Sequence, residues 1–263
     1  MITIGGVVIG DGLPCRVVAE LSNNHNGDRD RLGRLIDAAQ AAGADLVKFQ
    51  CYTPEELVAL RGDGPAPAPW GLRGWSMRDL YTKAQTPLDW FPKIAAHCQR
   101  VGMPWFSSVF GPDSLACLEA VGCPAYKVAR LDNQQEDLQD LIAQSPGEKP
   151  VLVSAEWGED VLGDLVLYCP KGYPPDPQTV RLPPHFGDHE TFQGFSYHGL
   201  DHHLPRVAAE RGCHLIEMHM QLAEEPGELE GDFSLTQYQF HVMALAVSQG
   251  LLPVPPRFHQ VSR

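Results

Sequence analysis

Short apolar segments rich in β-branched residues alternate along this chain with longer segments of helical periodicity, and this alternation constrains the fold more than any other feature. The strand-like segments are residues 16–21, 45–50, 104–110, 125–129, 150–155, 165–169, 194–198 and 214–220. The helical segments are residues 29–42, 87–101, 114–121, 135–144, 204–212 and 234–251. Strands that alternate with helices in this way predict one α/β domain over residues 1–263, a (β/α)8 TIM barrel.

Three local features refine the predicted barrel. Residues 1–8 predict an N-terminal hairpin that covers the barrel bottom, and residues 156–164 are too few for a full crossover helix between the fifth and sixth strands. Residues 62–74 and 171–184 are Pro/Gly-rich loops expected at the top face, where long loops are usually functional, although surface insertions would look the same. An open doubly wound sheet is the alternative, but no glycine-rich phosphate fingerprint follows the first strand.

The composition excludes several classes of protein. A net charge of -13 without a basic stretch argues against a general nucleic-acid or acidic-membrane binder. Seven cysteines, an odd number without a CxxC pair, favour a reduced intracellular protein over a disulfide scaffold. We expect no signal peptide and no membrane helix, and therefore a cytoplasmic protein.

Polar residues follow the predicted strands at their carboxyl ends, where a barrel of this kind places its active site. They are Glu20, Lys48, Gln50, Ser107, Ser108, Lys127, Ser154, Tyr173, Ser196, His198, Glu217 and His219. The lysines are the sharpest single signals because a buried lysine is costly unless it is paired. Two imidazoles at one end of a sheet suit a divalent metal, whereas two satisfied histidines at strand ends are the simpler alternative.

Seven ordered motifs resemble the sialic acid synthase family, which condenses phosphoenolpyruvate with an N-acylated amino sugar and releases phosphate. The motifs are AELSNNHNGD at 19–28, AGADLVKFQ at 42–50, PAYKVA at 124–129, YCPKGYP at 168–174, GFSYH at 194–198, EMH at 217–219 and DFSL at 232–235. One such motif would mean little, but seven in the right order are specific.

The resemblance implies a metal centre and an anion site. His198 and His219 would hold a divalent metal, commonly manganese in the family, with magnesium or cobalt as alternatives, and the metal would polarise the aldehyde oxygen of the open-chain sugar. The phosphate and carboxylate of phosphoenolpyruvate would be bound by ammonium and hydroxyl donors. These donors are Lys127, Ser108, Ser154 and Ser196.

The resemblance also assigns the residues between the two substrates. Lys48 would add positive charge near the reacting carbons, and Glu20 would handle a proton or a water molecule. Gln50 and Tyr173 would contact the sugar.

Several positions depart from the family pattern. Arg130 stands where the family has a serine, beside the predicted phosphate site, and Tyr197 replaces the aspartate before the first metal histidine. Glu230 or Asp232 would replace an acidic residue near the sugar, and we take Glu230 as the substrate-binding one. No antifreeze-like domain follows the barrel before Arg263, so we expect the catalytic barrel alone, with a homodimer left open.

The leading hypothesis is a metal-dependent synthase that joins phosphoenolpyruvate to an aldehyde and gives a 2-keto acid and phosphate. The first alternative keeps the metal but not phosphoenolpyruvate: an aldolase or lyase acting on a sugar or sugar phosphate, which Arg130 makes tenable. The second alternative is a non-catalytic barrel that binds sugar or phosphate. That alternative predicts loss of the metal ligands or of Glu20, and the sequence retains them.

Overall fold

Eight parallel strands close into a barrel in the computed structural model, which describes residues 1–187 and 192–249. The strands are β3 (Arg16–Glu20), β4 (Leu46–Cys51), β5 (Trp105–Val109), β6 (Tyr126–Val128), β7 (Val151–Ala155), β8 (Leu165–Tyr168), β9 (Gly194–Tyr197) and β10 (Leu215–Gln221). Each strand pairs with its successor, and pairing of β10 with β3 closes the ring. The predicted TIM barrel and its eight strands are confirmed.

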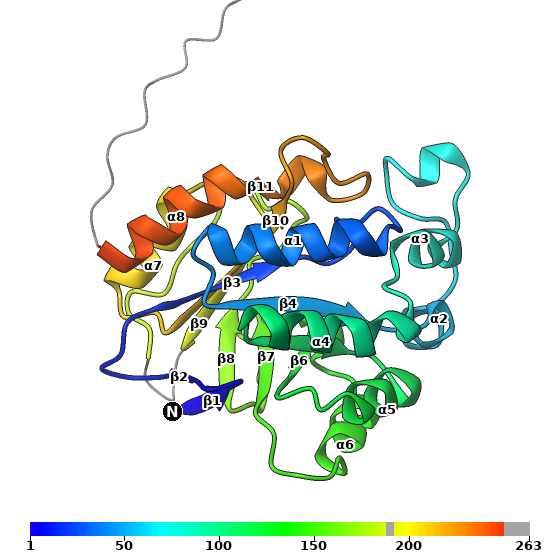
Figure 1. Cartoon of the computed structure of the whole chain (residues 1–263), viewed down its shortest axis with the longest axis horizontal. Helices are drawn as coiled ribbons and strands as arrows, with labels where there is room; N and C mark the ends of the chain where they lie inside the picture. The colour runs from blue at the N-terminus through cyan, green and yellow to red at the C-terminus, as the bar shows by residue number, and fades with distance from the viewer. Residues whose placement is uncertain (188–191, 250–263) are drawn as a thin grey trace, which may run out of the picture.

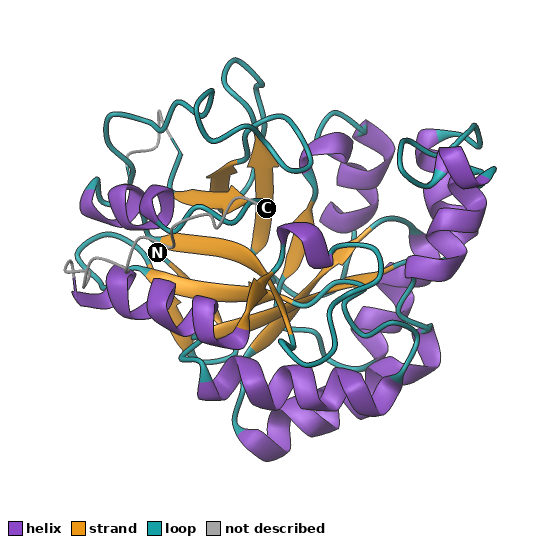
Figure 2. Cartoon of the chain, turned by 90° about the horizontal axis from the view of Figure 1, so that it is seen from above, coloured by secondary structure: helices purple, strands orange, loops and turns teal. Residues whose placement is uncertain are grey.

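Helices surround the strands (Figure 2). Those predicted are α1 (Arg29–Ala41), α4 (Phe91–Val101), α5 (Pro112–Ala120), α6 (Glu136–Ala143), α7 (His203–Glu210) and α8 (Gln237–Gln249), with the turn η2 (Leu88–Trp90) before α4. The Asp28 side chain caps α1 by accepting from the amides of Asp30 and Arg31, and the buried face of α1 packs on the barrel.

The last predicted helix is wrong at its start. Leu235–Thr236 forms a short strand, β11, in parallel with β10, so α8 begins at Gln237. Backbone pairing with the carboxyl end of β10, beyond the residues that pair with β9 and β3, overrides the local helical pattern here. The predicted end of this helix, residues 250 and 251, lies outside the described residues.

The segment after β4 contains two helices that the sequence analysis did not predict. These are α2 (Pro54–Arg61) and α3 (Met77–Ala84), which flank residues 62–74 and the short turn η1 (Gly71–Arg73). Each helix begins with a capping box, Thr53 with Glu56 and Ser76 with Asp79. Figure 1 places α2 and α3 beyond the carboxyl end of β4, so the predicted Pro/Gly-rich loop belongs to the top face.

An N-terminal hairpin closes the opposite end of the barrel, as predicted. Its strands β1 (Ile2–Ile4) and β2 (Val7–Ile9) pair in antiparallel fashion. Ile4 and Ile9 are fully buried and pack on inward-facing residues of the barrel strands, including Leu46 and Phe106. The hairpin therefore acts as an apolar floor (Figure 1).

The connection between β7 and β8 contains no helix, which confirms the predicted short crossover. Trp157 covers part of the surface that a crossover helix would cover. Its ring lies 5.2 Å from the ring of Phe192 and 6.0 Å from that of Tyr168 on β8. The outer face of β8 is thus covered by aromatic contacts.

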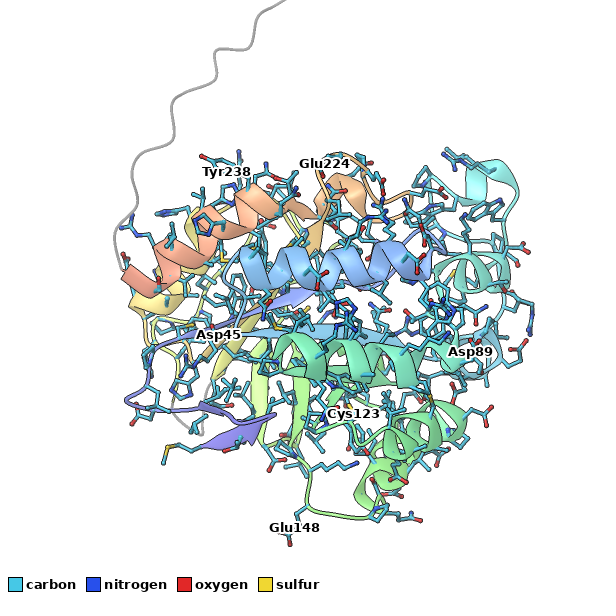
Figure 3. The ribbon with its side chains drawn as sticks, viewed as in Figure 1. Asp45, Asp89, Cys123, Glu148, Glu224 and Tyr238 are labelled. Atoms are coloured by element: carbon cyan, nitrogen blue, oxygen red, sulfur yellow. The ribbon has the colours of Figure 1, made fainter. Side chains whose placement is uncertain are left out.

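Acidic side chains lie on the outside of the molecule. Asp89, Glu148 and Glu224 are exposed and project from the periphery (Figure 3). By contrast, Lys48 and Lys127 are buried inside the barrel. Among the described residues, no helix is both long enough and apolar enough to cross a membrane.

Candidate active site

The register of the sheet brings polar residues of neighbouring strands to one level. Glu20 on β3 aligns with His219 on β10 and with Lys48 on β4. A second row consists of Gln50 on β4, Ser108 on β5 and Lys127 on β6. Because the strands are parallel, both rows lie near the carboxyl end of the barrel.

A buried network of charges joins these rows. Lys48 forms an ion pair with Glu20, and its Nζ lies 3.6 Å from Oε1 of Glu217. Lys127 Nζ lies 3.5 Å from the other oxygen of Glu217. All four side chains are almost completely buried. Glu217 therefore bridges the two lysines.

The surroundings shift the pKa values of these groups in different directions. Burial opposes ionisation of Glu217, but Lys127 and Lys48 outweigh it and lower the pKa to about 2. Burial also opposes the charge on Lys48, yet Glu20 and Glu217 raise its pKa above the ordinary value. Burial lowers the pKa of Lys127, because Glu217 offsets the loss of hydration only in part and Lys48 repels a second charge. Lys48 is thus the fixed cation, and Lys127 gives up its proton more readily.

Hydroxyl groups extend the network. Lys127 Nζ donates to Ser154 Oγ at 2.8 Å, and Lys48 Nζ donates to Ser108 Oγ at 3.3 Å. Ser196 Oγ donates at 2.9 Å to the carboxylate that bridges the lysines. Ammonium and hydroxyl donors therefore converge from five strands, an arrangement suited to an oxyanion.

Two histidines meet beside this network. His198 Nδ1, just after β9, lies 2.7 Å from His219 Nε2 on β10. Tyr173 Oη lies 3.0 Å from the same His219 nitrogen, and its ring packs on His198 with a centroid distance of 4.3 Å. On the opposite side of the His219 ring, Nδ1 lies 3.2 Å from Glu230 Oε2.

The surroundings shift the pKa values of the two histidines in opposite directions. Burial, together with the neighbouring His219, holds the pKa of His198 well below its usual range. Burial acts in the same direction on His219, but the Glu230 carboxylate outweighs it and raises that pKa. His198 is therefore neutral, and its Nδ1 shares a hydrogen bond with His219 Nε2.

This pair fits a metal ion in an open site. Two nitrogen ligands about 2.1 Å from one ion, at right angles, are about 3 Å apart, close to the separation of His198 Nδ1 and His219 Nε2. Glu230 favours a proton on His219 Nδ1, which leaves Nε2 available, the usual outer-shell arrangement of a metal histidine. No group of three His, Cys, Asp or Glu side chains among the described residues is placed to hold a metal. Two imidazole nitrogens alone would leave the other coordination positions of such an ion to water or to a ligand.

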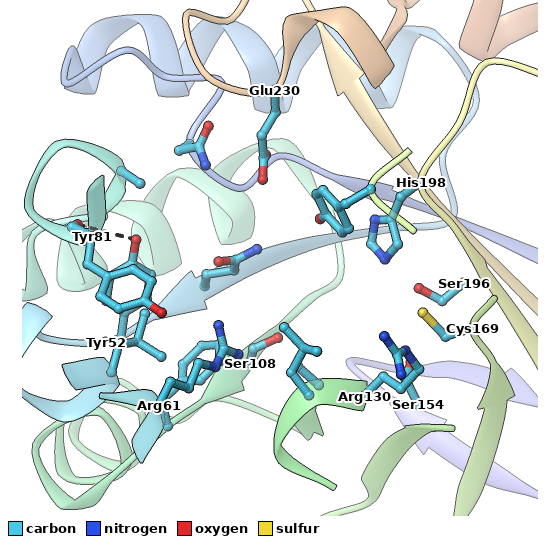
Figure 4. Close-up of a pocket in the computed structure, with 18 of the residues that line it drawn as sticks. Tyr52, Arg61, Tyr81, Ser108, Arg130, Ser154, Cys169, Ser196, His198 and Glu230 are labelled. Atoms are coloured by element: carbon cyan, nitrogen blue, oxygen red, sulfur yellow. Dashed lines mark hydrogen bonds between the residues drawn. The ribbon is translucent and has the colours of Figure 1, made fainter. Parts of the chain in front are cut away.

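The network opens into a cavity of about 770 Å³ at the top face. Predicted site residues that line it are Lys48, Gln50, Ser108, Lys127, Arg130, Ser154, Tyr173, Ser196, His198 and Glu230. Figure 4 shows several of them pointing into one space. Glu20 and His219 lie behind this wall, held by Lys48 and His198.

Arg130 and Gln50 already have protein partners. Arg130 lies on the turn η3 (Arg130–Asp132), and Figure 4 places it beside Ser154. Its Nη1 lies 3.5 Å from Glu159 Oε1, so it is a paired cation rather than a free one. Gln50 Nε2 donates to Ser22 Oγ at 2.7 Å.

The sequence matches the NeuB family over residues 35–250. The chain belongs to the NeuB family. It is similar to pseudaminic acid synthase of Campylobacter jejuni, with 31% identity over 89% of this chain and 73% of the relative. The pseudaminic acid synthase of Helicobacter pylori is 29% identical over 91% of this chain and 75% of that protein.

Solved structures share the NeuB barrel. N-acetylneuraminic acid synthetase from Leptospira borgpetersenii, in complex with citrate, superposes with a TM-score of 0.76 at 20% identity and covers 94% of this chain and 87% of that one. A truncated 3-deoxy-D-arabino-heptulosonate 7-phosphate synthase from Thermotoga maritima gives a TM-score of 0.62 at 14% identity. The match covers 95% of this chain and 93% of that one. Both likenesses support the fold.

Two residues of this site had no role assigned from the sequence. Glu217 contacts both lysines, and Ser22 donates its amide to Glu20 at 2.7 Å. Glu217 was named among the polar residues at the strand ends, and its place beside the site follows because side chains two residues apart in a strand share a face and His219 was assigned to the site. Ser22 follows its strand and has a left-handed backbone, with φ of 34°, which no local pattern indicates.

Proposed function

We propose that this chain catalyses a metal-dependent condensation of phosphoenolpyruvate with an aldehyde, an open-chain sugar or sugar-like acceptor, giving a 2-keto acid and phosphate. The observation that carries the proposal is the meeting of the His198–His219 nitrogen pair with the buried ammonium groups of Lys48 and Lys127 in one cavity. Membership in the NeuB family and the names of its relatives support it.

The proposed anion site uses the donors that converge on the barrel axis. Lys127 with Ser154, and Lys48 with Ser108, present ammonium and hydroxyl groups to the phosphate and carboxylate of phosphoenolpyruvate. Ser196 would add a third hydroxyl. Burial strengthens each of these contacts because the effective dielectric constant is lower than in water.

Charge balance supports a metal in this site. Lys48 and Lys127 face the carboxylates of Glu20, Glu217 and Glu230, which gives a formal charge of about -1 before any ligand binds. A divalent cation at the histidines would reverse that sign. We therefore expect tight binding of phosphoenolpyruvate to require the metal.

The proposed chemistry is balanced by one water molecule. C3 of phosphoenolpyruvate bonds to the aldehyde carbon, water adds to C2, and phosphate leaves with its bridging oxygen. Manganese, magnesium or cobalt held by His198 and His219 would supply Lewis-acid polarisation of the acceptor. Glu20, oriented by the Ser22 amide and Lys48, would accept a proton from that water.

The proposed acceptor contacts lie nearer the rim. Tyr173 is 53% exposed above the histidines, and Gln50, Arg130 and Glu230 line the same cavity. Arg130 is paired with Glu159, so it would bind the acceptor while it keeps its contact with that carboxylate.

Phosphate release over a panel of aldehydes, with manganese and phosphoenolpyruvate, tests the proposal. Calorimetry of phosphoenolpyruvate binding should run alongside on wild type, Lys127→Ala and the exposed control Lys93→Ala. We expect wild type and Lys93→Ala to bind and Lys127→Ala to lose most of the affinity. A wild-type protein that binds metal but no phosphoenolpyruvate would refute the synthase and favour the aldolase or lyase. Binding without turnover of any aldehyde would favour the non-catalytic barrel.

A further inference from the structure

The cavity has a second, apolar compartment away from the charged network. We call it the annex and define it by Leu57, Leu60, Met77, Leu80, Tyr81 and Phe110, all of which line the cavity. Five of these residues come from α2 and α3, the helices that follow β4. Figure 4 shows Tyr52 and Tyr81 on one side of the pocket, across from His198 and Ser196. A ligand whose reacting end lies at the histidines would therefore place its remote end in the annex.

The charged side chain at the wall of the annex is already neutralised. Arg61 Nε and Nη2 donate to the two carboxylate oxygens of Asp132 at 2.8 and 2.5 Å. The Arg61 guanidinium also lies over the Phe110 ring, 5.5 Å from its centroid. Asp132 is fully buried, so this pair is fixed in place. The annex thus favours apolar surface over a charged group.

One hydroxyl in the annex has no acceptor among the described residues. Tyr81 is 6% exposed, and the Arg61 guanidinium beside it can only donate to its Oη, so the hydroxyl hydrogen is left without an acceptor. The neighbouring Tyr52 Oη instead donates to the Tyr81 carbonyl at 3.4 Å. A buried hydroxyl without a partner is unfavourable, and an acceptor atom on a ligand would relieve it.

We propose that the annex binds an acyl group, longer than acetyl, carried by the acceptor at its end remote from the aldehyde. The acyl carbonyl accepts from Tyr81 Oη, and the alkyl chain packs against Leu57, Met77 and Leu80. Because Leu57, Met77 and Leu80 all line the cavity, a longer alkyl chain would bury more apolar surface there than a single methyl group. This inference rests on the proposed function, because the aldehyde is what places the reacting end at the histidines.

Binding of unreactive probes tests the annex without turnover. Mannitol and its terminal acetyl, butanoyl and hexanoyl monoesters are titrated by calorimetry into wild type, Leu80→Gln, Tyr81→Phe and Leu72→Gln. Leu72 is an exposed leucine of the same segment outside the cavity and serves as the matched control. In wild type and Leu72→Gln we expect affinity to rise about fourfold per added methylene.

The two annex variants separate the alkyl and carbonyl contacts. Leu80→Gln should remove most of the gain with chain length. Tyr81→Phe should keep that gain but lower the affinity of each ester about fivefold, with no effect on the matched alkyl ether. Affinity that does not change with chain length, or an equal gain in Leu80→Gln, overturns the inference. These titrations contain neither phosphoenolpyruvate nor metal, so their result does not depend on the condensation. If affinity rises with chain length but the condensation assay fails, only the proposed function is refuted.

Discussion

Replacing Glu217 with glutamine keeps the size of the side chain and its contact with Ser196 but removes the charge between Lys48 and Lys127. Removing one partner of a buried ion pair costs about 3–5 kcal/mol, because the remaining charge is left uncompensated. The depression of the Glu217 pKa from 4.5 to about 2 corresponds to roughly 3 kcal/mol, in the same range. We therefore expect Glu217→Gln to lower the free energy of unfolding at pH 7 by about 3 kcal/mol.

The dependence on pH follows from the direction of that shift. A carboxyl group whose pKa is depressed by folding contributes its stability above the unfolded value of 4.5 and loses it as the pH falls through about 2. The difference between wild type and Glu217→Gln should therefore be largest near neutral pH and shrink below pH 4.5.

Urea denaturation of the metal-free protein in chelator measures this difference, with an unchanged m-value as the check on two-state behaviour. The control is Glu210→Gln, which removes a surface i,i+4 pair with Arg206 and should cost less than about 1 kcal/mol. Adding Lys127→Met to Glu217→Gln should recover part of the loss, because one stranded charge is removed with its partner. If Glu217→Gln is no more costly than Glu210→Gln, the lysines do not depend on the buried carboxylate and the reasoning fails.

Three further predictions concern other parts of the molecule. His198→Ala combined with His219→Ala should abolish manganese binding in calorimetry, whereas the exposed His203→Ala should not. Burial lowers the pKa of His25 to about 4, so the unfolded state takes up the proton first as the pH falls below 6.5. The free energy of unfolding should therefore drop by roughly 3 kcal/mol between pH 6.5 and 4. In urea titrations, His25→Gln should flatten this dependence on pH. Ile4→Ala, in the fully buried floor, should cost about 2–5 kcal/mol in the same titrations, and a cost below 1 kcal/mol would mean that the hairpin is not part of the core.

The barrel was predictable because its signals are local. Each strand is a short apolar run, and the pairing rules for parallel strands leave few ways to arrange eight of them. Helices α2 and α3 were missed because they flank the Pro/Gly-rich residues 62–74, yet Thr53 with Glu56 and Ser76 with Asp79 carry the capping-box signature. The short β11 depends on an edge partner in β10, and no local pattern contains that partner.

The sequence predicted which residues lie at the candidate site better than it predicted which of them contact each other. Strand ends and family motifs placed Lys48, Lys127 and the histidines at one barrel mouth, and the register brings them there. The partners of these groups depend on side-chain contacts between segments far apart in the chain. Glu159 reaches Arg130, and Glu230 reaches His219, through loops whose course the sequence pattern does not define.

The hairpin floor has a consequence for kinetics. Ile4 and Ile9 seal the bottom of the barrel, and the cavity lies at the top face, where the annex is. An anion bound at Lys127 and Ser154, as proposed, would lie deeper in the cavity than the acceptor, so we expect the anion to bind first and phosphate to leave last. The order of substrate binding would then originate in an N-terminal hairpin on the far side of the molecule from the site.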